Sequence, residues 1–199
     1  MKNIAVEKAR VRVARAAAAL ERISNSSGFE TFSEAWTDFL LAANSIFSII
    51  EKGAANDAKS RQWYGCKKKQ GRQDPLVRYM VQARNADEHG IEPVAEHVPG
   101  HVAFGKGGES VHIEKLSIRN GELVNAEIHP VNGRLPTVEI QNPHPRLMPV
   151  IDDRYGIQQF DLPTEHLGSK IADVSPRTLA RLMMDYVTDL VNEAEGYIR

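Results

Sequence analysis

The chain has 199 residues, 42% of them hydrophobic, and its formal net charge at pH 7 is -1. These values predict a globular protein of one large domain or a compact pair of domains. The single cysteine, Cys66, excludes an intrachain disulfide, and no apolar run reaches the roughly 18 residues that a membrane-spanning helix requires. Charged residues near the N-terminus exclude the apolar stretch of a signal peptide, so we expect a cytoplasmic protein without membrane contact.

The first half of the sequence has the periodicity of helices. Apolar residues recur three and four positions apart along residues 1–52 and predict two helices, separated by the turn signal SNSSG at residues 24–28. A third helical segment is expected within residues 58–70. Asp74 and Pro75 supply an N-cap and a first-turn proline for a fourth helix that runs to about His89, with Gly90 just beyond it. Short connections between four helices favour an antiparallel bundle.

A basic segment covers the third predicted helix. Residues 59–73 (KSRQWYGCKKKQGRQ) contain six basic residues, two aromatic residues and no acid, within a first half (residues 1–90) that holds 15 Lys/Arg and 10 Asp/Glu. This composition is typical of a surface that contacts phosphates and stacks on bases, although a solvated lysine-rich helix face has it too. The candidate RNA-binding residues are Arg61, Lys67, Lys68, Lys69 and Arg72.

The second half holds 10 Lys/Arg and 16 Asp/Glu and begins with strand patterns. SVHIEKLSI (110–118) and LVNAEI (123–128) flank Asn120-Gly121, which predicts a β-hairpin. Further short extended runs indicate a small antiparallel sheet of about four strands. Ser175 and Pro176 then start a C-terminal helix. The expected fold is α+β: a helical bundle (1–92), an inserted antiparallel β region (93–172) and a helix (173–199) that packs back on the bundle.

The stretch RNADEHG, residues 84–90, stands near the end of the fourth predicted helix. Arg84 and Asp87 follow the core position Met80 by four and seven residues, so both project close to the apolar face. An ion pair between Arg84 and Glu88 would explain the arginine without any chemistry. It would not explain why a bundle helix carries these residues on its packing side.

This stretch contains Arg84, then the polar residue Asn85, and then His89. It resembles the signature of the HEPN superfamily, in which an arginine is followed by a polar residue and, after four to six intervening residues, by a histidine. In that superfamily the motif lies on a late helix of an α bundle. The resemblance covers residues 1–90 and the final helix. It implies a homodimer whose two motifs face each other and, in catalytic members, a metal-independent RNA endonuclease of toxin-antitoxin and antiviral systems, with an antitoxin as partner. Toxin-type members often have tyrosine two residues after the histidine, where this chain has Ile91.

The residue types suit this chemistry. RNA supplies its own nucleophile, the 2′-hydroxyl, so a nuclease without metal or cofactor needs a proton-transfer group and a fixed cation. His89 fits the first role and Arg84 the second, with Asn85 as an orienting group and Asp87 or Glu88 as supports. Side chains five positions apart on an ideal helix, such as those of Arg84 and His89, point in directions about 140° apart. We therefore expect either that the helix ends before His89 or that a dimer brings the groups together.

Two other functions remain open. A non-catalytic dimeric module could bind RNA or protein through the helical half. A metal-dependent hydrolase could use a histidine cluster, with carboxylates at Glu92, Glu96 and Glu114 nearby; its four imidazoles are His89, His97, His101 and His112. Pro99 and Gly100 separate His97 from His101, so these two rings do not share a helix face.

Overall fold

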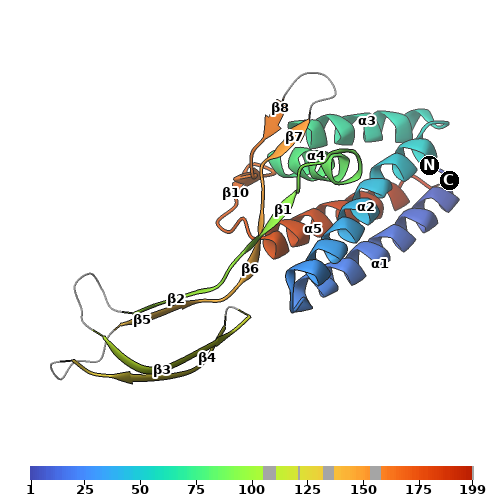
Figure 1. Ribbon diagram of the computed structural model, residues 1–199. Helices are drawn as coiled ribbons and strands as arrows, with labels where there is room; N and C mark the ends of the chain where they lie inside the picture. Colours follow the sequence, from blue (N-terminus) through green and yellow to red (C-terminus); the bar gives the residue numbers. More distant parts are fainter. Residues whose placement is uncertain (105–110, 121, 132–136, 153–157, 199) are drawn as a thin grey trace. The chain divides into compact units, whose positions relative to one another are not determined.

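The computed structural model describes residues 1–104, 111–120, 122–131, 137–152 and 158–198. Within them five helices carry most of the regular structure (Figure 1): α1 (Asn3–Asn25), α2 (Phe29–Ala54), α3 (Ala58–Gln73), α4 (Pro75–His89) and α5 (Pro176–Glu195). The strands between α4 and α5 are β1 (Ala95–Val98), β2 (His101–Phe104), β3 (His112–Arg119), β4 (Glu122–His129), β5 (Val138–Gln141), β6 (His144–Leu147), β7 (Val150–Asp152), β8 (Gln158–Phe160), β9 (Glu165–His166) and β10 (Ser169–Lys170). The predicted α+β class, with β structure inserted after the fourth helix, is confirmed.

The chain divides into two compact units. The first consists of Met1–Glu96 and Leu147–Arg199, and the second of His97–Arg146. The β region expected at residues 93–172 is thus distributed over both units: residues 97–146 form the second, whereas residues 147–172 belong with the helices. None of the described helices combines the length and the apolar character that crossing a membrane requires.

The helix boundaries follow from local sequence. Asp57, Asp74 and Ser175 each accept a hydrogen bond from the backbone N–H three residues further on, at 2.8, 2.9 and 3.4 Å respectively. These bonds satisfy N–H groups that lack a partner in the first turn of α3, α4 and α5. Gly90 ends α4 with an extended backbone (φ -88°, ψ 173°), and a Cβ there would lie 2.7 Å from the Ala86 carbonyl oxygen. A close contact, not a left-handed conformation, therefore requires this glycine.

The hydrophobic core is centred on α2, which contacts each of the other four helices. Its inward face consists of fully buried large side chains, including Trp36, Phe39 and Leu40. This face accounts for the apolar periodicity that predicted the second of the two helices within residues 1–52. Gly53 lets α1 approach α2 closely, because a Cβ at that position would lie 2.4 Å from the Ala5 Cβ.

The C-terminal strands of the first unit pack on α4. The Tyr79 hydroxyl donates a hydrogen bond to the Met148 carbonyl at 2.9 Å. The buried Asp74 carboxylate contacts His166 Nδ1 at 3.0 Å and accepts a hydrogen bond from the Leu167 backbone N–H at 2.7 Å. Asp74 thus caps α4 and fixes the β9–β10 hairpin at once.

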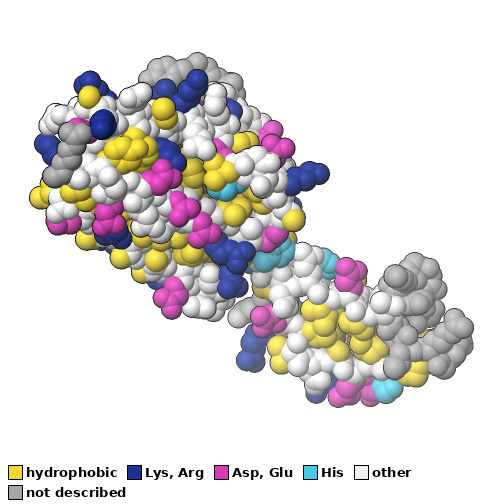
Figure 2. Space-filling model, turned by 180° about the vertical axis from the view of Figure 1, so that it is seen from behind, with side chains coloured by type: hydrophobic (Ala, Val, Ile, Leu, Met, Phe, Trp, Pro, Cys, Tyr) yellow, Lys and Arg dark blue, Asp and Glu magenta, His cyan; other side chains and the backbone are white. Residues whose placement is uncertain are grey.

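The second unit contains two antiparallel ladders, β2–β5 and β3–β4. The sequence predicted a sheet of about four strands; among the described residues the strands instead pair as separate two-stranded ladders. The predicted hairpin at residues 110–128 is β3–β4, and Asn120 has the positive φ (53°) of a two-residue turn, while Gly121 lies outside the described residues. Figure 2 shows hydrophobic side chains exposed on this unit, where Leu116, Ile118 and Ile140 are 40–52% exposed.

Candidate functional site

A cavity of about 710 Å³ opens in the first unit between α2, α3, α4, α5 and β8. We call it the basic cavity, because its lining includes five basic side chains and one acidic side chain, Glu51. The basic ones are Lys67, Lys68, Arg72, Arg78 and Arg84. This volume lies within the range of about 300–1,000 Å³ for small-molecule sites.

Helical periodicity explains how these residues come together. Lys67, Lys68 and Arg72 lie within six residues on α3, so they share a broad side of that helix. On α4, Arg78 precedes Asn85 by seven residues, which places the two in one stripe that also borders the cavity. Neighbouring stripes of two packed helices therefore form one positively charged wall.

The cations of this wall differ in their partners. Lys68 pairs with Glu51 at 2.6 Å, and Lys67 pairs with Glu193 at 2.6 Å. Arg72 and Arg78 have no recorded ion pair among the described residues, although the Arg78 guanidinium lies 5.4 Å from the centre of the Phe160 ring. Two arginines are thus available to an anionic ligand without the loss of a protein carboxylate.

The remaining lining is aromatic and amide-rich. Phe47, Tyr64, Phe160 and Tyr186 contribute rings. Burial raises the pKa of Tyr64 and, with the nearby Asp74 and Glu193 carboxylates, that of Tyr186, so both phenols stay neutral. The cavity therefore combines a cationic wall with uncharged, largely apolar walls.

The RNADEHG motif meets the cavity through its first two residues. Arg84 Nη1 donates a hydrogen bond to Asn85 Oδ1 at 3.2 Å, and Asn85 Nδ2 donates one to Gln82 Oε1 at 3.1 Å. All three side chains line the cavity. Asn85 thus orients the arginine in this structure, and its contacts are with Arg84 and Gln82, not with His89.

His89 lies outside the cavity lining, and its side chain is 61% exposed. Because α4 continues through His89, the side chains of Arg84 and His89 leave the helix in directions about 140° apart. The two side chains nevertheless reach one group: Glu88 Oε2 lies 2.6 Å from Arg84 Nη2 and 3.8 Å from His89 Nε2. An anionic oxygen at this position faces both the guanidinium and the imidazole.

Asp87, one of the two predicted supports of the motif, contacts α2. Burial raises its pKa above the ordinary range, and a hydrogen bond with Thr37 opposes that shift. Because Thr37 belongs to α2, this contact ties the end of α4 to the bundle. Glu88, the other candidate support, is the residue that contacts Arg84 and His89.

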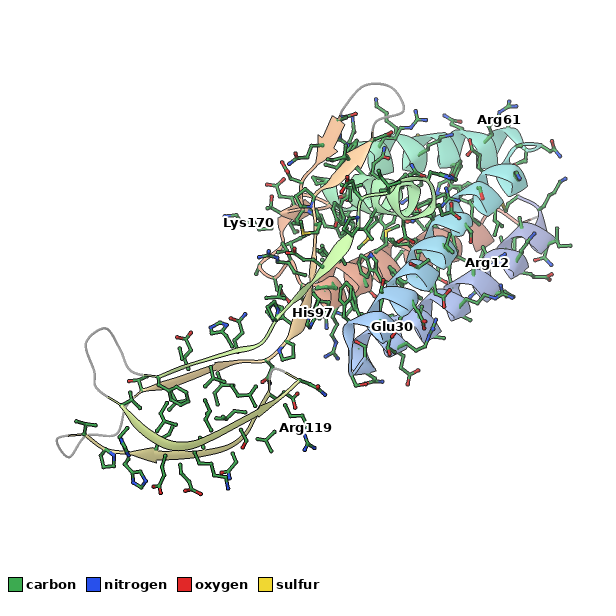
Figure 3. The ribbon with its side chains drawn as sticks, in the orientation of Figure 1. Arg12, Glu30, Arg61, His97, Arg119 and Lys170 are labelled. Atoms are coloured by element: carbon green, nitrogen blue, oxygen red, sulfur yellow. The ribbon has the colours of Figure 1, made fainter. Side chains whose placement is uncertain are left out.

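The structure sorts the predicted site residues into two groups. Lys67, Lys68, Arg72, Arg84 and Asn85 come together around the basic cavity. Arg61 and Lys69 are exposed on α3 and do not line it. Figure 3 shows Arg61 at the outer edge of that helix.

Sequence reasoning missed Arg78 on α4 and the residues of α2 that line the cavity. Arg78 stands seven residues before Asn85, so helical spacing alone could have placed both on one face. Asn44 and Phe47 could not be identified in this way, because they sit at the margin of the apolar stripe of α2. Only the packing of α3 and α4 makes them part of a site.

The histidines proposed as a metal cluster do not form one. Among the described residues, no group of three or more His, Cys, Asp or Glu side chains is placed to hold a metal ion. His89 ends α4, whereas His101 and His112 begin β2 and β3 of the second unit. His112 instead lies beside His129, a histidine outside the proposed cluster, with ring centres 5.9 Å apart across the β3–β4 ladder.

Comparison with known proteins adds no assignment. No family model matches the chain, and neither a curated protein nor a solved structure matches it.

Proposed function

We propose that the protein is a metal-independent RNA endonuclease of the HEPN type, in which Arg84 and His89 act on one phosphate. The observation that carries this proposal is the position of Glu88 Oε2, within 2.6 Å of Arg84 Nη2 and 3.8 Å of His89 Nε2. A phosphate oxygen that replaced this carboxylate oxygen would face the same two groups. The basic cavity beside Arg84 supports the same substrate class, because RNA affinity depends on cations that contact phosphates.

The proposed reaction uses the RNA 2′-hydroxyl as nucleophile. The 2′-oxygen attacks the adjacent phosphorus, its proton passes to the His89 imidazole, and the bond from phosphorus to the 5′-oxygen breaks. The protonated His89 then gives this proton to the 5′-oxygen, which leaves as a hydroxyl, and the other product ends in a 2′,3′-cyclic phosphate. Arg84 stabilises the negative charge that grows on the phosphate oxygens, with a planar guanidinium that matches two of them.

A second candidate is a non-catalytic module that binds RNA through the same cavity. The position of His89 favours it, since this residue does not line the cavity and its side chain is 61% exposed. In that case Arg84 contributes binding and His89 contributes little. The two candidates therefore differ in what the loss of His89 alone does.

The resemblance to HEPN proteins also leads us to propose a homodimer, an antitoxin or other protein partner, and a cytoplasmic role in a toxin or defence system. A dimer would place a second Arg84 and His89 near the first pair. Sedimentation of the purified chain tests this assembly directly, and a monomer at all concentrations would exclude it.

The decisive assay incubates the purified protein with mixed RNA in EDTA. We expect cleavage with 2′,3′-cyclic phosphate ends, and its loss in the Arg84→Ala/His89→Ala variant. The matched control is Arg15→Ala/His144→Ala, which removes one exposed arginine and one exposed histidine elsewhere. RNA that is bound but left intact by the unmodified protein would support the binding module instead, and cleavage that persists in Arg84→Ala/His89→Ala would refute the proposed site.

A further inference from the structure

We propose that the basic cavity holds one unpaired base of the RNA, next to the phosphate at Arg84. The inference rests on the proposed function for the neighbouring phosphate, but the cavity itself can be tested without cleavage. It makes single-stranded RNA the substrate class, with one nucleotide turned out of the strand. A base within a duplex could not enter, because its edge is paired and its faces are stacked.

The first argument is the combination of size and wall chemistry. The cavity, at about 710 Å³, is large enough for a base with its sugar. Rings from Phe47, Tyr64, Phe160 and Tyr186 line it, and an aromatic wall suits a flat, uncharged heterocycle. A site for phosphate alone would not need a cavity of this volume or apolar walls.

The second argument is the hydrogen-bonding capacity left in the lining. Asn44 Nδ2 donates to the Leu40 carbonyl at 2.9 Å and to the Met80 carbonyl at 3.2 Å, which uses both of its N–H groups. Its Oδ1 therefore remains as an acceptor. Gln82 Oε1 accepts from Asn85 at 3.1 Å, which leaves the Gln82 Nε2 group as a donor. One acceptor and one donor match a base edge that carries a neighbouring donor and acceptor, such as the N6–H₂ group and N7 of adenine.

The third argument is the placement of charge. Arg72 and Arg78, which have no recorded ion pair in the described part of the chain, line the cavity together with Arg84. A nucleotide in the cavity would have arginines for its phosphates as well as rings and amides for its base. The three kinds of contact together distinguish a nucleotide from an aliphatic or purely anionic ligand.

The test measures binding of small probes by calorimetry. The probes are AMP, GMP, CMP and UMP, with ribose 5-phosphate and inorganic phosphate as references. Because stacking contributes about 1–3 kcal/mol per base, we expect at least one nucleotide to bind about 5- to 150-fold more tightly than ribose 5-phosphate. Equal affinity for all probes would overturn the base site and leave a simple phosphate site.

A variant that fills the cavity makes the test specific. Ser48 lines the cavity and is exposed, so Ser48→Trp places an indole in the cavity and leaves Arg84 and His89 themselves unsubstituted. Ser33→Trp, at an exposed position on the same helix outside the lining, is the matched control. We expect Ser48→Trp to weaken nucleotide binding at least tenfold and Ser33→Trp to leave it unchanged. Equal affinity in both variants would overturn the proposal.

The outcomes separate this inference from the proposed nuclease. If nucleotides bind as expected but no RNA is cleaved, the base site stands and the nuclease proposal fails. If RNA is cleaved in the cavity-filled Ser48→Trp variant at the rate of Ser33→Trp, the nuclease stands and the base site fails. Circular dichroism of both variants establishes that each is folded before binding is compared.

Discussion

Glu88 gives the sharpest prediction, because its carboxylate occupies the position that a phosphate oxygen would need. Glu88→Gln removes the negative charge but keeps the shape of the side chain. We expect this variant to bind single-stranded RNA more tightly, since the nucleic acid no longer has to break the Arg84–Glu88 ion pair. The opposite expectation, that Glu88 positions Arg84 for binding, predicts weaker binding.

The magnitude follows from the geometry of the pair. Arg84 and Glu88 stand at i and i+4 on one helix, 2.6 Å apart, with side chains that are 35% and 29% exposed. Such pairs contribute about 0.3–1 kcal/mol, which corresponds to about a 2- to 5-fold decrease in the dissociation constant. Losing the pair should lower stability by no more than about 1 kcal/mol, or about 2–4 °C in Tm.

The assay uses a His89→Ala background, so that the RNA stays intact while binding is measured. Fluorescence anisotropy of a labelled oligonucleotide compares His89→Ala with Glu88→Gln/His89→Ala. The control is Glu195→Gln in the same background, which removes an equal charge from a surface pair with Arg10 away from the cavity. Unchanged or weaker binding in the Glu88 variant would refute the idea that this carboxylate holds the phosphate position.

Three further predictions concern the scaffold. Gly53→Ala places a Cβ 2.4 Å from the Ala5 Cβ, so we expect a loss of about 1–3 kcal/mol in urea denaturation and substantial recovery in the Ala5→Gly/Gly53→Ala double variant; no recovery would contradict the close approach. Asp74→Ala removes a helix cap and leaves the Leu167 N–H without its acceptor, so about 2–4 kcal/mol should be lost, and a loss below about 1 kcal/mol would contradict this reading. Hydrogen bonds from Thr178 and Ser175 hold the pKa of Asp173 below its ordinary value. The contribution of Asp173 to the stability of the start of α5 is therefore present above pH 4 and is lost as pH falls through the folded-state pKa. Protection factors, which correct amide exchange for its intrinsic pH dependence, should therefore fall in the first turn of α5 at acidic pH, and this fall should be absent in Asp173→Asn.

Much of the fold could be predicted because local rules and the long-range structure agree. Caps and prolines set the starts of α4 and α5, at Asp74 with Pro75 and at Ser175 with Pro176. The cap hydrogen bonds join residues three positions apart, so they depend on local sequence alone. The pairing of the strands was not predictable in the same way. Strand partners are chosen by contacts between residues far apart, and short extended runs such as residues 136–140 and 147–151 are compatible with several pairings.

The candidate site was likewise predictable in part: its residue types follow from the sequence, and their meeting does not. The sequence alone determined which residue types were present: the motif of Arg84 and His89, the cations of α3, and the helices that carry them. Only the tertiary structure decided which of these meet, because the cavity forms where α2, α3, α4, α5 and β8 pack together. Arg78 and Asn44 become site residues through that packing, whereas Arg61 and Lys69, equally basic in sequence, remain outside it. Periodicity fixes the face of a helix on which a side chain lies, but the element that packs against that face depends on contacts across the whole chain.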